Sequence, residues 1–184
     1  MKKYIILFLF TLQSSFINAQ LYSDWKWLHQ SPQGNDLHWV KMWDVNTIYA
    51  IGSKGTFVKT TDRGATWTVQ HKAGRVSGIP IQVGDLKNAW FFNQNTGIVV
   101  GTFGSIFRTT NAGVTFDSVP GNPAPTNSVI TGISFINDQT GYVISQITNY
   151  RLMKTTDGGL NWNAGYGTAP PYTNPFEIYA FNEK

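Results

Sequence analysis

Short runs in which apolar and polar residues alternate dominate the chain from residue 37 onward. Alternation with a period of two is typical of β-strands that have one buried face. No segment shows a sustained helical period. The pattern therefore predicts an all-β chain of four antiparallel strands per unit. The expected strands lie at residues 38–43, 48–52, 55–59, 67–71, 89–92, 98–101, 104–108, 133–136, 142–144 and 150–154.

A nine-residue motif occurs three times, at Lys59–Trp67, Arg108–Phe116 and Lys154–Trp162. Its common form is basic-Thr-Thr-(Asp/Asn)-x-Gly-x-(Thr/Asn)-aromatic. The fourth positions of successive copies are 49 and 46 residues apart. Self-similarity at such a period is the signature of a repeat architecture.

Each copy of the motif predicts a tight turn between two strands. Asp62 is expected to accept backbone N–H groups in an Asx-type turn, and Gly64 to adopt a positive φ. Trp67 should anchor the return strand over the apolar layer. The second copy should form a weaker version of this turn, because Asn111 lacks the charge and Phe116 the indole N–H. The candidate site residues therefore have structural roles: Thr60, Asp62, Gly64, Trp67, Thr109, Asn111, Gly113, Phe116, Thr155, Asp157, Gly159 and Trp162.

The motif resembles the Asp-box, or BNR, repeat of sialidases, sortilin-type receptors, xyloglucan-cleaving glycosidases and photosystem II assembly factors. The stretches Phe91–Phe116 and Phe135–Trp162 follow most closely the repeat of the assembly-factor family. Residue Ile48 departs from it, since glycine is favoured there. The resemblance implies β-propeller blades with the box at the turn between their third and fourth strands. It also implies that the box is remote from any active centre, and a photosynthetic role is not implied.

Three blades are expected at residues 37–73, 85–120 and 128–166, and a fourth is expected to start at 176–184. Three blades and one strand leave a ring incomplete, because propellers have about four to eight blades. We therefore expect a fragment of a longer protein, with its remaining blades as partners. The alternative is a short open array completed by self-association. Within 20–36, Trp25–Gln30 resembles a return strand that closes a propeller, or alternatively an aromatic-rich leader on the surface.

Residues 1–19 have the layout of a secretory signal peptide, with Lys2 and Lys3 before an apolar run and a small residue, Ala19, at the end. Export would make the protein secreted or bound to the cell surface. The signal resembles those of Bacteroidetes.

Without the two lysines, 12 basic residues face 10 acidic ones. The basic residues form no stripe, which argues against nucleic acid as a partner. We expect no membrane span, and the absence of cysteine excludes thiolate chemistry.

The sequence offers no convincing catalytic set. Sialidases need a cluster of arginines, whereas Arg63 and Arg108 belong to the boxes. A glycosidase needs two carboxylates across the scissile bond. Asp44 and Asp138 could supply them, although Asx turns explain both more simply. The aromatic residues could stack on sugars or belong to the core: Trp25, Trp27, Trp39, Trp43 and Trp90. The three histidines have no metal-ligand spacing, and we expect neither a metal nor a cofactor.

The leading hypothesis is a secreted, non-enzymatic propeller that binds a protein or a glycan through the loops between its strands. Whether the chain is an enzyme is left open. The alternative is a glycoside hydrolase, xyloglucanase-like or sialidase-like, whose catalytic residues lie partly outside this sequence. Fold alone does not decide between them, because one fold hosts many activities.

Overall fold

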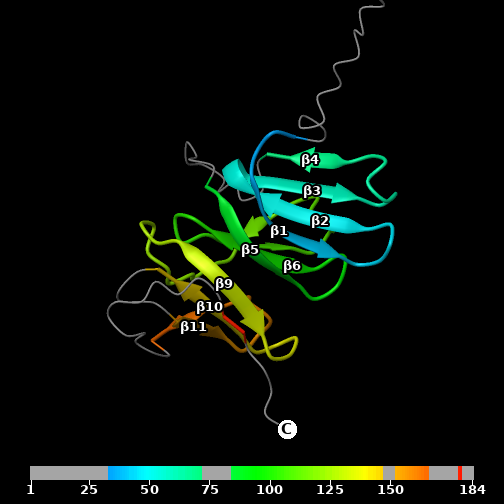
Figure 1. Ribbon diagram of the computed structural model, residues 1–184. Coiled ribbons are helices and arrows are strands. Elements are labelled where there is room, and N and C mark those ends of the chain that lie inside the picture. Colours follow the sequence, from blue (N-terminus) through cyan, green and yellow to red (C-terminus); the bar gives the residue numbers. More distant parts are fainter. Residues whose placement is uncertain (1–32, 72–83, 147–151, 166–177, 180–184) are drawn as a thin grey trace, which may run out of the picture.

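The computed structural model describes residues 33–71, 84–146, 152–165 and 178–179. This part of the chain forms three four-stranded antiparallel sheets, so the predicted fold class is confirmed (Figure 1). The first sheet contains β1 (Leu37–Met42), β2 (Ile48–Gly52), β3 (Thr56–Thr60) and β4 (Thr68–Gln70), with the short 3-10 turn η1 (Ser53–Gly55) between β2 and β3. The second contains β5 (Leu86–Phe91), β6 (Gly97–Gly101), β7 (Ile106–Thr109) and β8 (Asp117–Ser118). The third contains β9 (Ile130–Phe135), β10 (Gly141–Ser145), β11 (Leu152–Thr155) and β12 (Asn163–Ala164).

Within each sheet the strands lie in sequence order, each hydrogen-bonded to the next. Neighbouring sheets meet face to face, and their first strands β1, β5 and β9 approach one another. Figure 1 shows these three strands following one another across the molecule. The first strand is thus the inner strand of each sheet, and the fourth is the outer one.

Two apolar clusters lie between the sheets. The cluster between the first and second sheets is mostly aromatic, with Phe91 at its centre in contact with the rings of Trp39, Trp43, Tyr49 and Phe57. Phe57 also contacts the ring of Phe116, the aromatic residue of the second box. Offset and edge-to-face pairs of this kind add to the burial of apolar area.

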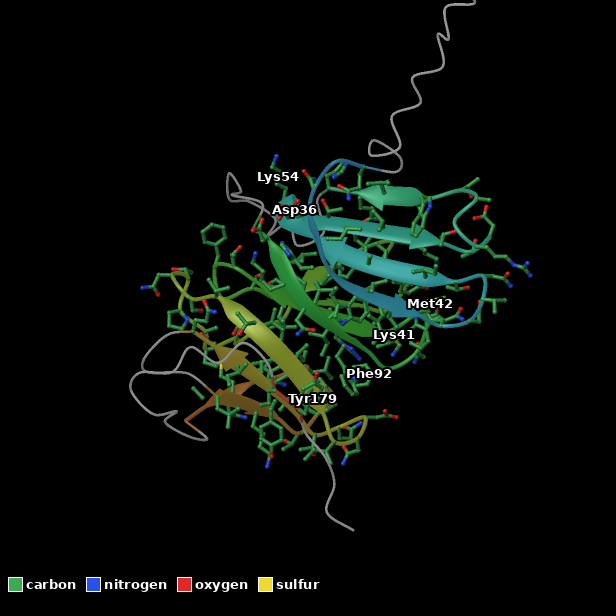
Figure 2. All side chains as sticks on the ribbon, in the orientation of Figure 1. Asp36, Lys41, Met42, Lys54, Phe92 and Tyr179 are labelled. Carbon is green, nitrogen blue, oxygen red and sulfur yellow. The ribbon has the colours of Figure 1, made fainter. Side chains whose placement is uncertain are left out.

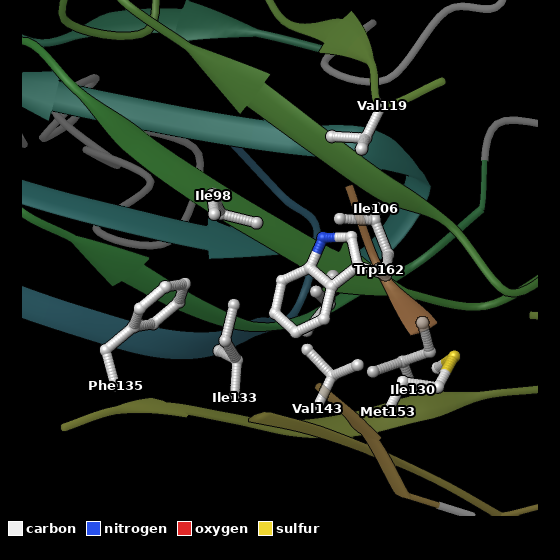
Figure 3. Packing of buried hydrophobic residues seen from close by; sticks show 10 residues of the cluster. Ile98, Ile106, Val119, Ile130, Ile133, Phe135, Val143, Met153 and Trp162 are labelled. Carbon is white, nitrogen blue, oxygen red and sulfur yellow. The ribbon is translucent and has the colours of Figure 1, made fainter. Parts of the chain in front are cut away.

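The cluster between the second and third sheets is mostly aliphatic. In Figure 3 the indole of Trp162, from the third box, lies between Ile98 and Ile106 on one side and Ile133 and Val143 on the other. The aromatic residue that ends a box thus packs against the preceding sheet. Burying such a ring stabilises the fold by roughly 2–3 kcal/mol.

Every strand presents alternate side chains to the preceding and to the following sheet. The preceding sheet covers the matching side chains of β5 and β9, which are 0–5% exposed: Leu86, Ala89, Phe91, Ile130, Ile133 and Phe135. The equivalent residues of β1 are 48–64% exposed: Leu37, Val40 and Met42. Their equivalence follows from their cross-strand partners in the three ladders. Among the described residues, nothing therefore covers this apolar face of the first sheet, which we call the open face.

A cross-strand pair explains why residue 48 departs from the repeat. Phe91 lies opposite Gly97, and Phe135 lies opposite Gly141. Each ring occupies the space that a Cβ on the glycine would need. In the first sheet the pair is Met42 opposite Ile48. The first sheet has no phenylalanine at this position, so no glycine is needed, and the larger isoleucine is accommodated.

The box aromatics differ from expectation in one respect. Trp67 was predicted inside the return strand, but β4 begins one residue later, at Thr68. The N–H of Thr66 donates to Asp62, and the indole N–H of Trp67 donates to the carbonyl of Gly64 at 3.0 Å. These groups belong to the turn, so the ladder begins after them. The other two return strands also start just after the aromatic residue.

Of the aromatic residues considered for sugar stacking, three lie against the apolar clusters. Trp39 and Trp43 are half-buried against the first cluster, and Trp90 is half-buried against the second. The predicted signal peptide and the Trp25–Gln30 segment lie outside the described residues, as do 180–184 of the predicted fourth unit.

The pairing of phenylalanine with glycine predicts the effect of a single methyl group. Gly97→Ala should destabilise the protein by about 1–3 kcal/mol, because the new Cβ overlaps the Phe91 ring. Phe91→Met in the same chain should recover part of this loss, as Met42 does opposite Ile48. Denaturant midpoints of the two single variants and the double variant measure the coupling. Gly34→Ala is the control, since nothing lies within 4 Å of its Cβ position. Additive losses in the double variant would refute the pairing.

Candidate functional site

The residues singled out in the first box come together around one threonine hydroxyl. The Thr60 hydroxyl donates to Asp62 Oδ1 at 2.8 Å and accepts the N–H groups of Asp62 and Gly64. The Asp62 carboxylate accepts the N–H of Thr66 at 2.8 Å and its hydroxyl at 2.5 Å. Thr109 and Thr155 make the same bonds in their boxes. All three threonines are buried. Sequence reasoning assigned them only a strand preference and missed this hydroxyl.

The second box replaces the carboxylate by an amide without losing a contact. Asn111 Oδ1 accepts from the Thr109 hydroxyl and the Thr115 N–H, and Asn111 Nδ2 donates to the Thr115 hydroxyl at 2.9 Å. The last bond runs in the opposite direction to its counterpart in the first box. The second turn keeps the bonds of the Asn111 side chain, but it lacks the charge and the indole bond that Trp67 makes to Gly64, as the sequence predicts.

Hydrogen bonds to the carboxylates lower the pKa values of the two box aspartates. At Asp62, the hydroxyl and the backbone N–H of Thr66 are the main causes. At Asp157, burial alone would raise the pKa, but bonds from Asn161, Thr155 and Leu160 outweigh it. Both residues are therefore charged through the physiological range.

The boxes lie at one end of the sheets, together with the turns that join first and second strands. In those turns Asp44 Oδ1 accepts the N–H groups of Asn46 and Thr47, as Asn93 and Asn137 do for theirs. These bonds, with Asn46 first, hold the pKa of Asp44 below its usual range. In the third sheet Asn137, not Asp138, occupies this position. The backbone N–H of Arg63 donates to Asn46 and joins box and turn; Ala112 and Gly158 donate likewise.

A hollow of about 630 Å³ lies between the first and second boxes. Phe57, Lys59 and Trp67 line it together with Thr61, Thr66, Thr68 and the loop Ala112–Val114. The side-chain amide of Gln70 closes one side by donating to the carbonyl of Val114 at 3.0 Å. The hollow lies at the outer rim, away from the inner strands.

The opposite end of the sheets carries the hairpins that join second and third strands, and we call it the loop face. Figure 2 labels Lys54 and Asp36 at this end of the first sheet and Met42 at the other. Two equivalent hairpin tips lie here, Lys54-Gly55 and Phe103-Gly104. Both residues of each tip have φ between 56° and 63°, the backbone of a type I′ turn. The glycines adopt this conformation freely.

Lysine and phenylalanine are unusual at the first position of such a turn, where asparagine or glycine is preferred. A left-handed conformation costs these side chains about 1–2 kcal/mol each. Lys54 is exposed and gains no burial in return, while Phe103 is 45% exposed. Arg63 and Ala112 in the boxes have the same left-handed conformation, so the loop face is distinguished by its exposed side chains and its hollow rather than by strain alone. Sequence reasoning did not single out the side chains at these two positions.

Asp85 joins the two tips. Its carboxylate accepts the backbone N–H of Lys54 at 3.1 Å and pairs with the Lys87 ammonium at 3.0 Å. Its own N–H donates to the Thr102 hydroxyl, and its carbonyl accepts the Thr102 N–H. The Lys54 N–H, followed by Lys87, lowers the pKa of Asp85, so the bridge is charged. One residue thus fixes the two strained turns relative to each other.

A serine and a histidine meet beside this bridge. His38 Nε2 lies 3.0 Å from the Ser53 hydroxyl and 3.4 Å from the Lys87 ammonium. Nucleophilic catalysis requires a base that is oriented by a third group at its other nitrogen. Within the described ranges, no carboxylate is recorded at His38 Nδ1, and Lys87 competes for Nε2. The contact therefore lacks the orienting partner of a catalytic triad.

Phe103 forms the wall of a second hollow, of about 510 Å³, which Thr102 and Thr126–Val129 complete. The opposite wall of the hollow, around Ser128, is held in place by hydrogen bonds. The Ser128 N–H and hydroxyl both donate to the Pro125 carbonyl, and the Gly104 N–H donates to the Ser128 carbonyl at 2.8 Å. Asn122 Nδ2 binds the Gly104 carbonyl. The hollow is therefore preorganised, with an aromatic wall and a polar rim.

The described residues contain no group of three or more histidine or carboxylate side chains that could hold a metal ion. They also contain no helix long and apolar enough to cross a membrane.

The fold and its loop face define a repeat protein of the β-propeller class. The structure of YCF48 bound to D1 peptide superposes with a TM-score of 0.55 at 21% identity, covering 72% of this chain and 41% of that one. The structure of YCF48 from Cyanidioschyzon merolae has a TM-score of 0.51 at 19% sequence identity, and the match covers 72% of this chain and 40% of that one. The GH74 enzyme of Niastella koreensis has a TM-score of 0.56 at 20% sequence identity, and the match covers 77% of this chain and 24% of that one.

The chain thus spans less than half the length of the structures it matches. At these identities the likeness establishes the fold alone. No family model matches the sequence. No curated protein matches it either.

The box carboxylates predict a pH dependence that Asn111 cannot share. Since the pKa of Asp62 is lowered on folding, its contribution is fully present above about pH 4 and is lost as the pH falls through the lowered value. Asp62→Asn should therefore flatten the fall of the thermal midpoint between pH 6 and pH 3. Asn111→Asp should steepen it, since Thr115 can then donate as Thr66 does. Parallel profiles for these two variants and the parent would contradict the assignment.

Proposed function

We propose that this protein is a non-enzymatic binding module that captures a polypeptide on its loop face. The observation that carries the proposal is the pair of strained, exposed side chains at equivalent tips, Lys54 and Phe103. Asp85 and the wall at Pro125–Ser128 hold them in place. Support for a polypeptide ligand comes from YCF48, a propeller whose structure was solved with a peptide bound.

A glycoside hydrolase is the second candidate, because GH74 enzymes share the fold. A glycosidase keeps one carboxylic acid protonated by raising its pKa. The described carboxyls with a perturbed pKa are all shifted downward: Asp44, Asp62, Asp85 and Asp157. Three of them lie in turns at the end opposite the loop face. These observations favour binding over hydrolysis.

Export is part of the proposal. The basic start and apolar run of residues 1–19 support a signal peptide, and the protein would then be secreted or held at the cell surface. Its ligand would be a polypeptide met outside the cytoplasm.

Peptide selection tests the function. We expect the chain from residue 20 onward to enrich sequences from a displayed dodecapeptide library, and xyloglucan to be neither bound nor cleaved. The double variant Lys54→Asn/Phe103→Asn should lose the enriched peptides, whereas Val45→Asn, at the other end of the sheets, should keep them. Cleavage of xyloglucan, or binding of polysaccharide without any enriched peptide, would overturn the proposal.

We also propose that the open face of the first sheet packs against a further four-stranded sheet. The equivalent faces of the second and third sheets are each covered by a neighbour. At the other end of the array, Ile178 lies against β9, with its Cγ2 3.0 Å from a Cβ position on Gly132. A similar contact joins the second and third sheets, where the side-chain amide of Asn88 in β5 donates to the Thr131 carbonyl of β9, one residue before Gly132. Residue 178 thus lies where the inner strand of a next sheet would run.

An uncovered apolar sheet face should make the isolated chain self-associate. Light scattering of the chain from residue 20 should show a mass that rises with concentration. Val40→Glu/Met42→Glu should lower this mass, because both side chains lie on the open face. Val114→Glu, at a residue 65% exposed elsewhere, is the control. A strictly monomeric parent would show that the face is already covered.

A further inference from the structure

The two hairpin tips offer different chemical groups, and together these groups indicate the class of ligand that would bind. The Lys54 tip offers an ammonium group, while the Phe103 tip offers a ring beside a hollow of about 510 Å³. Lysine pairs with carboxylates, and an aromatic ring packs with another ring or an aliphatic side chain. The tips lie on adjacent sheets and are tied together by Asp85.

The charge of Lys54 is available to a ligand. The Lys87 ammonium already pairs with Asp85, while Lys54 approaches Asp85 only through its backbone N–H. No bond to the Lys54 ammonium is recorded within the described part of the chain. The neighbouring charged and titratable groups are Asp36, His38, Asp85 and Lys87, and the exposed Asp36 weakens the local positive potential. The lysine should therefore contribute selectivity, and the hollow most of the affinity.

The spacing of the tips fits an extended segment. Sheets that pack face to face lie about 10 Å apart, and a segment in the polyproline II conformation rises about 3.1 Å per residue with three residues per turn. Residues three apart in such an extended segment therefore lie on one side of it and span the distance between adjacent sheets. The polar rim of the hollow at Thr126 and Asn127 can bond to peptide groups that pass over it.

We propose that the loop face binds an extended polypeptide segment with an acidic residue at Lys54 and an aromatic or large aliphatic residue, about three positions away, in the hollow beside Phe103. This inference rests on the proposed function and names the class of its ligand.

The strain supplies a test that separates binding from folding. Lys54→Asn and Phe103→Asn place in each turn the residue that a type I′ turn prefers, so each variant should melt at the temperature of the parent or above it. The same substitutions should weaken a selected acidic–aromatic peptide about fivefold for Lys54→Asn and about tenfold for Phe103→Asn. Fluorescence anisotropy of the labelled peptide gives the dissociation constants. Phe103→Tyr should bind like the parent.

A charge exchange completes the experiment. Lys54→Glu should reject the acidic peptide and accept the same peptide with its acidic residue changed to lysine. Selected peptides that lack the acidic–aromatic pairing, but still depend on the two tips, would overturn this inference and leave the proposed function intact. Peptides that bind both Asn variants like the parent would overturn both. Failure to bind any peptide, with or without binding of a polysaccharide, would overturn both.

Discussion

The interaction on which the rest of the structure depends is the packing of each inner strand against the sheet before it. Leu86, Ala89 and Phe91 become buried only because the first sheet lies over them, and the third sheet repeats the arrangement. A single four-stranded sheet has two faces to cover and cannot cover them alone. Stability in such an array is the sum of contacts between neighbours, as in other repeat proteins. The open face of the first sheet is equivalent to the faces that are buried in the second and third sheets, which is the basis for proposing a further sheet against it.

The hydrogen bonds of the three boxes fix one end of the sheets, independently of the hairpin tips at the loop face. At the box end, a buried threonine hydroxyl and an aspartate or asparagine satisfy nearly the same backbone groups three times. Turns built in this way hold the third and fourth strands of each sheet without help from the loop face. Left-handed non-glycine residues occur at both ends, at Arg63 and Ala112 in the boxes and at Lys54 and Phe103 in the tips. Strain at Lys54 and Phe103 is thus a local cost borne by a stable scaffold.

The sequence allowed the fold class to be predicted because the box fixes its own turn. Aspartate, glycine and an aromatic residue at fixed spacing define the hairpin, and its repetition implies equal sheets. The hydroxyl of Thr60 was missed, because a threonine before a turn suits a strand equally well. The start of β4 was misplaced by one residue for a related reason. The backbone N–H of Thr66, just before Trp67, donates to Asp62 as part of the turn, and alternation of apolar residues does not reveal that bond.

The loop face was harder to foresee, because its signal is conformational. Lys54 and Phe103 each precede a glycine, and Lys-Gly or Phe-Gly does not by itself imply that the first residue has a positive φ. The signal is visible only when the two hairpins are aligned by their repeat, since both then form two-residue loops that require a left-handed first position. The contact of His38 with Ser53 and Lys87 was also not predictable from the sequence. The three residues come from three segments, and only the packing of adjacent sheets brings them together.

The direction of the pKa shifts links this geometry to function. A propeller that hydrolyses glycosides must keep a carboxyl group protonated near its substrate, and burial or a neighbouring carboxylate raises the pKa in that way. The perturbed carboxyls described here have the opposite environment, with backbone N–H groups, hydroxyls or an ammonium facing them. Asp85, the one at the loop face, is committed to holding two turns together. Its carboxylate and its backbone N–H hold the Lys54 and Phe103 turns in place, which agrees with the proposed role of the loop face in binding.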